Sequence, residues 1–245
     1  MMSYLLYLWA IIEIVLIVYA LYNIKKVISI YKKDKTRYYY PSDKLENILT
    51  QVYSKRKIVT LMVSEIMVFY FALFGWFIKK RSFEDVVEYT YSKETMYGVL
   101  FWVIMGVSLI EVPVTHYFLS LWNVTIAWVV TGVTLYGMIW LLGDYKAIVH
   151  YPIRLSADRL YLRIGLRAKV DVDVSNIERL TSSVDDEIKE EYEHLLLMTT
   201  VEPNVYISLK ERVEVVGLFG MRKEVDKIAF SMDDYRGFVN RLDVV

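Results

Sequence analysis

The chain contains no cysteine, and this absence removes several kinds of chemistry at once. Disulfides, thiolate metal sites and cysteine nucleophiles are excluded. The 29 basic and 29 acidic residues give a formal net charge of zero, so no bulk attraction to nucleic acid is expected. The sequence also lacks a P-loop, a dinucleotide-binding glycine set, an HExxH zinc motif and a serine elbow. These absences favour a protein without enzymatic activity, although they leave the question open.

Charged residues are scarce over long stretches of a chain that is 56% hydrophobic. A hydrocarbon core of ~30 Å is crossed by about 20 apolar residues of helix. Four segments meet this requirement and predict an α-helical bundle of four transmembrane helices. They run over residues 4–22, 58–78, 97–119 and 123–142. The N-terminal segment lacks the basic leader of a secretory signal, so it is interpreted as a retained span.

The loops between these segments differ in charge, which bears on orientation. Four spans place both termini on one side of the membrane and the loop of residues 23–57 on the other. That loop is rich in lysine and arginine, and the positive-inside rule therefore places it in the cytoplasm. The loop before the third span mixes both signs. The sequence thus predicts a multi-pass protein of the cell membrane with the lipid bilayer as its first partner.

After Gly143 the pattern changes from long apolar runs to alternation with period two, which is typical of half-buried strands. The predicted strands cover residues 152–156, 159–164, 169–174, 205–209, 213–216 and 225–230. Ser231 to Asp234 resembles a helix N-cap, and a closing helix is expected over residues 235–242. Two domains follow: a transmembrane domain over residues 1–146 and a soluble, antiparallel β domain over residues 147–245.

The β domain begins Arg154-Leu155-Ser156-Ala157-Asp158-Arg159-Leu160-Tyr161-Leu162-Arg163-Ile164-Gly165, a strand, turn, strand and glycine. With a C-terminal helix, this order resembles bacterial pleckstrin-homology-like domains over residues 150–243. The resemblance implies a small bent barrel that serves interactions and lies in the cytoplasm, opposite to the side that the loop charges give. The membrane half, with Glu111, His116 and the stretch from Tyr136 to Tyr145, is similar to uncharacterised bacterial membrane proteins.

Three predicted spans each carry a carboxylate, Glu13, Glu65 and Glu111, and the third span also carries His116. Ionisable groups inside a membrane cost about 2.5–3.5 kcal/mol each on insertion scales and often mark function. At 1.5 Å per residue the three carboxylates lie ~14, ~11 and ~12 Å from the loop-side ends of their spans, which is one depth. This set suits a divalent transition metal such as Mn, Fe or Zn, or a proton path. Equally, each glutamic acid is neutral and bonds a neighbouring hydroxyl.

Two functions therefore remain open. In the first, the protein is a scaffold or regulator at the membrane surface, and its β domain binds another membrane or peripheral protein. In the second, Glu13, Glu65, Glu111 and His116 form a metal or proton site for transport or a metal-dependent reaction. The arginine series Arg154, Arg159, Arg163 and Arg167 adds a weaker possibility, phosphate binding, against ordinary solvent-facing strand positions. The first function is favoured because it requires no chemistry that the sequence leaves unspecified.

Overall fold

The computed structural model describes residues 22–80, 83–92, 97–185, 189–195 and 202–242. By its internal contacts the chain divides into two compact units, Met1–Val63 and Ser64–Val245, which are described separately. The predicted span over residues 4–22 and Glu13 lie outside the described residues. A count of four spans therefore remains a prediction, as does a domain boundary at residue 146.

The first unit contains helical backbone over residues 22–33, the helix α2 (Pro41–Val52) and the beginning of α3 (Arg56–Phe74). Pro41 stands at the first turn of α2, where a missing N–H costs no hydrogen bond. The hydroxyl of Thr60 donates to the carboxylate of Glu46 at 3.1 Å and so links α3 to α2. The segment that the sequence presented as a basic loop thus contains a folded helix.

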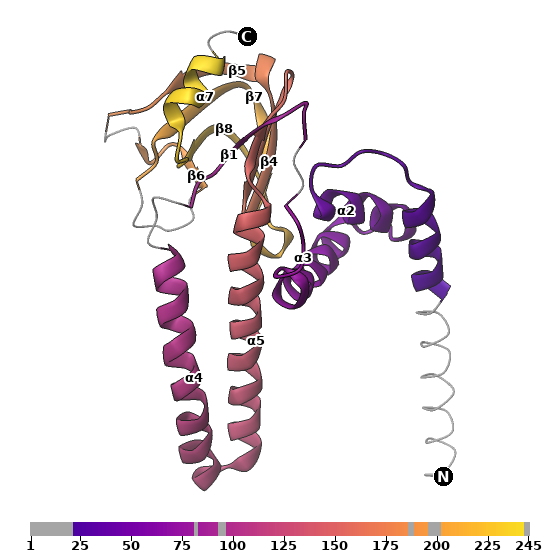
Figure 1. Ribbon diagram of the computed structural model, residues 1–245, viewed down its shortest axis with the longest axis vertical. Helices are drawn as coiled ribbons and strands as arrows, with labels where there is room; N and C mark the ends of the chain where they lie inside the picture. Colours follow the sequence, from indigo (N-terminus) through magenta and orange to yellow (C-terminus); the bar gives the residue numbers. More distant parts are fainter. Residues whose placement is uncertain (1–21, 81–82, 93–96, 186–188, 196–201, 243–245) are drawn as a thin grey trace. The chain divides into compact units, whose positions relative to one another are not determined.

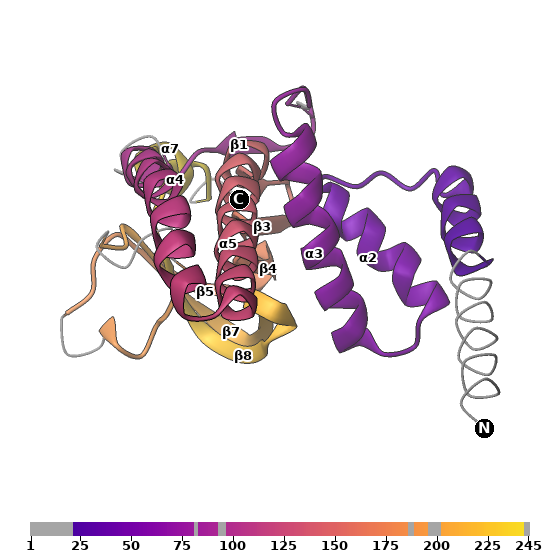
Figure 2. The same ribbon diagram turned by 90° about the horizontal axis from the view of Figure 1, so that it is seen from below.

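Three helices of the described residues are long and apolar enough to cross a membrane: α3, α4 (Tyr97–Trp122) and α5 (Val124–His150). They coincide with three of the predicted spans. Asn123 separates α4 from α5, and its side chain caps α5 by accepting from the amide of Ile126 at 3.1 Å. The two helices lie side by side as an antiparallel pair (Figure 1, Figure 2), as the short turn predicted.

The α4–α5 pair presents an almost wholly apolar surface to its surroundings. Only 6% of the most apolar window of each helix is buried within the protein. Leu109, Ile110, Leu121 and Val133 are each at least 65% exposed. In water such a surface would be strongly unfavourable, whereas lipid tails solvate it. This exposure supports a membrane protein.

Residues that lie beyond the α4–α5 pair form a mixed sheet, together with one strand from before it. The described strands are β1 (Val87–Tyr89), β2 (Ile153–Leu155), β3 (Arg159–Ile164), β4 (Ala168–Asp173), β5 (Ile177–Thr181), β6 (Glu193–Leu195), β7 (Val205–Val216) and β8 (Arg222–Phe230). The order is β1-β2-β3-β4-β7-β8-β6, and β5 also pairs with β7. All pairs are antiparallel except β6 with β8.

The first two strands of this sheet have an unusual connection. β1 pairs with β2 in the register Tyr89↔Ile153, although both helices α4 and α5 lie between them in the sequence. The helical pair is thus an insertion between two neighbouring strands. β1 was not predicted, because three residues in a charged loop carry too little periodicity to indicate a strand.

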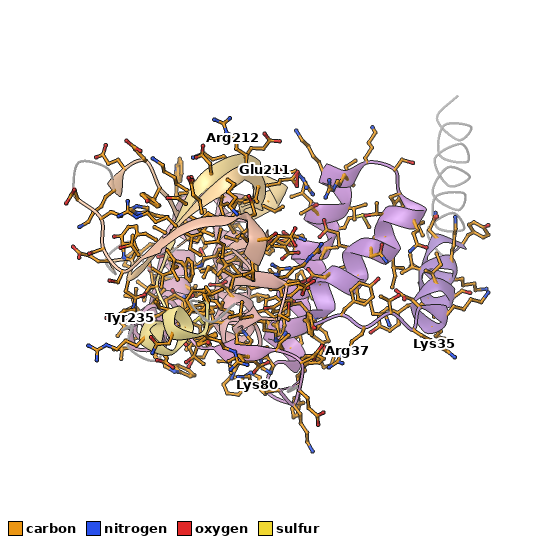
Figure 3. The ribbon with its side chains drawn as sticks, turned by 90° about the horizontal axis from the view of Figure 1, so that it is seen from above. Lys35, Arg37, Lys80, Glu211, Arg212 and Tyr235 are labelled. Carbon is orange, nitrogen blue, oxygen red and sulfur yellow. The ribbon has the colours of Figure 1, made fainter. Side chains whose placement is uncertain are left out.

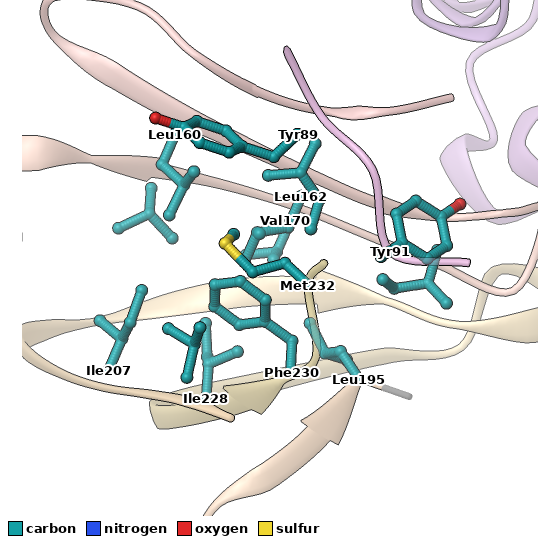
Figure 4. Close-up of a cluster of buried hydrophobic side chains, with 14 of the residues drawn as sticks. Tyr89, Tyr91, Leu160, Leu162, Val170, Leu195, Ile207, Ile228, Phe230 and Met232 are labelled. Carbon is teal, nitrogen blue, oxygen red and sulfur yellow. The ribbon is translucent and has the colours of Figure 1, made fainter. Parts of the chain in front are cut away.

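The core of the sheet follows the predicted alternation. Leu160, Leu162 and Ile164 of β3 are at most 2% exposed and pack with residues of β4, β7 and β8 (Figure 4). The helix α7 (Tyr235–Leu242) contributes the fully buried Phe238, and Asp234 caps it by accepting from the amide of Gly237 at 3.0 Å. The predicted closing helix is therefore confirmed.

Strand boundaries were predicted less well than strand positions. The two strands expected over residues 205–209 and 213–216 form one strand, β7, whose register with β8 shifts between Ser208 and Val213. This irregularity interrupts the alternation that the sequence analysis used, and it made one long strand look like two. β5 and β6 were not predicted.

Candidate functional site

The carboxylate of Glu65, in the candidate span α3, has a specific partner on another helix. Its Oε2 accepts a hydrogen bond of 2.8 Å from the hydroxyl of Tyr136 on α5. A hydroxyl donor of this kind stabilises a polar group that lipid cannot solvate. The contact is the one expected if Glu65 serves to hold the helices together.

The other predicted site residues have different surroundings. Glu111 is exposed on α4. His116 lies with its Nδ1 2.8 Å from the hydroxyl of Thr131 and its ring edge-on to Trp128, both on α5. Within the described residues, no group of three or more histidine, aspartate or glutamate side chains is arranged to hold a metal. Because Glu13 lies outside those residues, the four-residue metal or proton site remains a hypothesis.

Close contact between α3 and α5 occurs at Gly143. A Cβ added to this glycine would lie 2.5 Å from the carbonyl oxygen of Val68, so the backbones meet without room for a side chain. Further along, the His150 Nε2 lies 3.1 Å from the carbonyl of Ile78, just beyond α3. By contrast, Gly132 and Gly137 have no other described atom within 4 Å of such a Cβ. Gly143 therefore permits close helix contact here, as does Gly75 just after α3, where an added Cβ would lie 2.8 Å from the Cβ of Lys146 on α5.

One residue after Gly143 lies the most unusual group of the second unit, the carboxylate of Asp144. Asp144 is fully buried, and its two oxygens are both occupied. Oδ2 accepts from the Tyr97 hydroxyl at 2.8 Å and from the Arg167 guanidinium at 2.8 and 2.9 Å, while Oδ1 accepts from the amide of Leu166 at 2.9 Å. The Arg167 guanidinium also donates to the Tyr97 hydroxyl at 2.7 Å. We call Asp144, Tyr97 and Arg167 the junction triad.

The junction triad joins three parts of the second unit. Tyr97 is the first residue of α4, Asp144 lies in the last part of α5, and Arg167 is the last residue of the turn between β3 and β4. A buried charge is tolerated only when it is paired and fully hydrogen-bonded, and here a salt bridge and two further donors meet that condition. The triad therefore fixes the sheet to both membrane helices.

The β3–β4 turn fits this carboxylate through a glycine. Gly165 adopts a positive φ of 52°, a region that favours glycine. A Cβ at this position would lie 2.4 Å from the Asp144 Oδ1. Its amide donates to the hydroxyl of Tyr91 at 2.8 Å, so the loop before α4 also contributes. Glycine is required here both for the turn and for the close approach of Asp144.

Asp144 was not among the predicted site residues, because an acidic residue that directly follows an apolar run is typical of the end of a membrane span. The predicted fourth span ended at Leu142, whereas α5 continues to His150. Within this longer helix the buried carboxylate is paired with Arg167. No local signal could have found this pair, since its members lie 23 positions apart in different elements.

The arginine series of the β domain is engaged by carboxylates. Arg154, only 2% exposed, binds Glu88 of β1 at 2.8 Å. Arg159 lies 3.2 Å from Asp173, and Arg163 lies 2.6 Å from Asp171. With Arg167 on Asp144, each of the four arginines has an acidic partner. The series therefore holds the sheet together, and this arrangement gives no support to phosphate binding.

Comparison with protein-family models, curated proteins and solved structures gives no match to this chain. The features of the chain that bear on its function are therefore the geometry of the junction triad and the exposed apolar helices.

Proposed function

We propose that the chain is a multi-pass membrane protein whose β domain acts as a scaffold or regulator at the membrane surface. The observation that carries this proposal is the junction triad, in which a fully buried Asp144 joins both helices of the α4–α5 pair to the sheet. A domain on a flexible tether needs no such attachment. A domain that presents a binding surface at a fixed height above the bilayer does.

We further propose that the β domain is of the pleckstrin-homology-like type. Its opening strand, turn, strand and glycine, its largely antiparallel order and its C-terminal helix with Phe238 in the core support this assignment. The parallel pairing of β6 with β8 and the contribution of β1 from before the helical pair depart from the simple pattern. Domains of this type serve interactions more often than catalysis, which agrees with a scaffold.

The same connection gives the proposed scaffold a way to act as a regulator. Asp144 of α5 accepts hydrogen bonds from the β3–β4 turn and from Tyr97 of α4. A partner that displaces this turn therefore also displaces Tyr97 and α5. A change at the surface of the domain is thereby coupled to the membrane helices through hydrogen bonds and packed side chains. An event in the membrane would act on the domain by the same route.

Site-specific photo-crosslinking in native membranes tests the scaffold function. A photoreactive amino acid is placed at Glu211 or Arg212, which project from β7 in Figure 3, and at the exposed Lys223 of β8. We expect a discrete protein adduct from at least one position. We also expect the adduct to weaken in Asp144→Asn and to persist in Asp226→Asn, whose side chain is 52% exposed.

Two outcomes would contradict the proposal. The absence of any adduct from all three positions at native expression would remove the scaffold function. An adduct that is equally strong in Asp144→Asn would show that the β domain binds a partner without the fixed attachment, which would contradict the proposed role of the junction triad.

A further inference from the structure

The turn between β7 and β8 carries exposed apolar side chains. The amide of Gly217 donates to the carbonyl of Met221 at 2.7 Å and closes a five-residue tip, Gly217-Leu218-Phe219-Gly220-Met221. Phe219 is 58% exposed and Met221 is 65% exposed, and Leu218 is half-buried. Hairpin tips in water usually carry polar residues and glycine, so this composition calls for an explanation. We call these five residues the hairpin tip.

The backbone of the hairpin tip is strained at Phe219. Phe219 has a φ of 56°, and it is the one non-glycine residue of the described chain with a positive φ. A bulky side chain in this region is unfavourable, and such strain tends to occur where function requires it. An Asn or Gly at this position would relieve the strain and remove the apolar surface. The chain instead keeps a phenyl ring facing outward.

The position of the hairpin tip relative to α5 is set by contacts within the sheet. Val216, just before the tip, pairs with Lys169 of β4. A Cβ on Gly217 would lie 4.0 Å from the carbonyl of Arg167, whose guanidinium binds Asp144 of α5. The tip therefore lies beside the β3–β4 turn, near the level of Asp144. In Figure 1 this end of the sheet lies next to the upper part of α5.

The exposed apolar surface of α4 ends near the level of Asp144, whereas on α5 it extends to Val149, which is 52% exposed. On α4, Tyr97 is 5% exposed within the junction triad, and the exposed apolar surface begins at Val99, which is 60% exposed. Trp76 and Phe77, just beyond α3, are 55% and 83% exposed, and the Lys146 Nζ lies 3.0 Å from the centre of the Trp76 ring. Exposed aromatic residues with nearby lysine are typical of the boundary between lipid tails and headgroups.

The charges behind the hairpin tip match a lipid surface. The first charged residues after it are Arg222, Lys223 and Glu224. Lys223 is bound to Glu193, and the adjacent strand contributes Lys169. Glu214 is the first acid on the β7 side, and it is paired with Arg222. Apolar side chains at the end and basic side chains behind them complement acyl chains and anionic headgroups respectively.

We propose that the hairpin tip enters the headgroup region of the same bilayer that α4 and α5 cross. Phe219 and Met221 insert among the upper acyl chains, while Lys169 lies at the phosphates. The β domain then touches the membrane at a point separate from its helical attachment. This inference is independent of the proposed scaffold function, because it concerns lipid alone and requires no protein partner.

Depth-dependent fluorescence quenching tests this inference on the full chain. Because the protein has no cysteine, single labels can be placed without removing any native thiol. An environment-sensitive fluorophore is attached to Phe219→Cys, Met221→Cys or Glu211→Cys, and each protein is placed alone in nanodiscs of phosphatidylcholine and phosphatidylglycerol. Doxyl groups on the acyl chains quench from the lipid side, and iodide quenches from water. Glu211 is an exposed residue of β7 outside the tip and serves as the matched control.

We expect the labels at positions 219 and 221 to shift to the blue, to lose fluorescence with doxyl lipid and to be shielded from iodide. The label at position 211 is expected to respond only to iodide. Labels at 219 and 221 that behave like the label at 211 would overturn the inference. If Phe219→Cys does not fold, Met221→Cys decides the question, since Met221 lies at an ordinary φ of −61°. Single-copy nanodiscs ensure that a second copy cannot provide the shielding.

Discussion

The hydroxyl of Tyr97 donates a hydrogen bond of 2.8 Å to the carboxylate of Asp144, across 47 positions of sequence. This contact joins the first residue of α4 to the last part of α5 at the end of the pair that carries the sheet. At the other end only Asn123 separates the two helices. The pair is thus closed at both ends, by a short turn and by a buried polar contact that also includes Arg167.

Asp144→Asn is expected to destabilise the protein substantially. The amide retains the size of the side chain but removes the charge that faces Arg167. Loss of one partner from a buried ion pair costs about 3–5 kcal/mol, and the 25% exposure of Arg167 reduces this to about 2–3 kcal/mol. Thermal unfolding in detergent, followed by tryptophan fluorescence, measures the change. The exposed Asp226→Asn should remain within about 0.5 kcal/mol of the parent. Equal melting temperatures for the two variants would contradict the role of the triad.

Gly143→Ala is expected to disturb the contact between α3 and α5. The added methyl group would lie 2.5 Å from the Val68 carbonyl, so the helices must move apart. Overpacking of this kind costs about 1–3 kcal/mol. Gly137→Ala, one of the positions with no described neighbour within 4 Å, is the matched control and should be neutral or slightly stabilising because alanine favours helix. Similar melting temperatures for both variants would show that the close approach at Gly143 is unimportant.

Much of this fold could be predicted from the sequence because its signals are local. The lengths of the apolar runs predicted α3, α4 and the start of α5, and the alternation of Leu160, Leu162 and Ile164 predicted a buried strand. The pairing of strands was beyond such reasoning. β1 joins β2 across both membrane helices, and nothing in residues 87–89 indicates this partner. Contacts that depend on the whole fold have no local signature.

The first loop and the β domain are expected on opposite sides of the membrane. This outcome follows if α3, which lies between them in sequence, crosses the bilayer as its length and composition allow. Single cysteines at Lys35 and Glu211, both exposed, are treated with an impermeant maleimide in intact and in permeabilised cells. One position should react only after permeabilisation. Reaction of both positions in intact cells, or of neither, would show that α3 does not span the membrane. If only one position reacts in intact cells, that position lies outside the cell and the other lies in the cytoplasm.

Glu65→Gln is expected to fold with nearly normal stability. Glutamine retains an oxygen that accepts from the Tyr136 hydroxyl, whereas Tyr136→Phe leaves the Glu65 side chain without that donor. We therefore expect Tyr136→Phe to lower stability by about 1 kcal/mol and Glu65→Gln to lower it by less. Thermal unfolding provides the comparison.

Metal analysis of the same proteins tests the alternative function directly. A metal site built from Glu13, Glu65, Glu111 and His116 requires stoichiometric metal in the parent and its loss in Glu65→Gln and Glu111→Gln. That result would replace the stabilising role of Glu65 with a functional one. Metal content unrelated to either substitution would leave the hydrogen bond to Tyr136 as the explanation for this acid.

Stability is expected to fall at alkaline pH because of Tyr89. Burial raises the pKa of its phenol above the ordinary value near 10, so the folded state holds the proton more tightly than the unfolded state. The stabilising contribution is fully present below about pH 10 and is lost as the pH rises toward the raised folded pKa. Melting temperatures between about pH 9 and about pH 11 should fall less steeply in Tyr89→Phe than in the parent.

The candidate site was less predictable than the fold. Glu65 and His116 were chosen because titratable groups in apolar helices are rare, and both have partners on α5. Asp144 was not predicted as a site residue because it lies at the end of an apolar run, where acidic residues are common. Its importance depends on Arg167 and Tyr97, and only the folded chain brings these side chains together.

The insertion of the helical pair between β1 and β2 has a consequence for how the protein can be divided. A fragment that begins at residue 147 lacks Tyr89 and Tyr91, two residues of the hydrophobic core of the sheet. We therefore expect this fragment not to fold as a separate domain. Excision of α4 and α5, by contrast, keeps all the strands of the sheet in one chain. Tyr89 faces Ile153 across the ladder, so residues near these two can be joined by a short turn after excision of both helices. We expect such a chain to retain the complete sheet without the two candidate membrane spans α4 and α5.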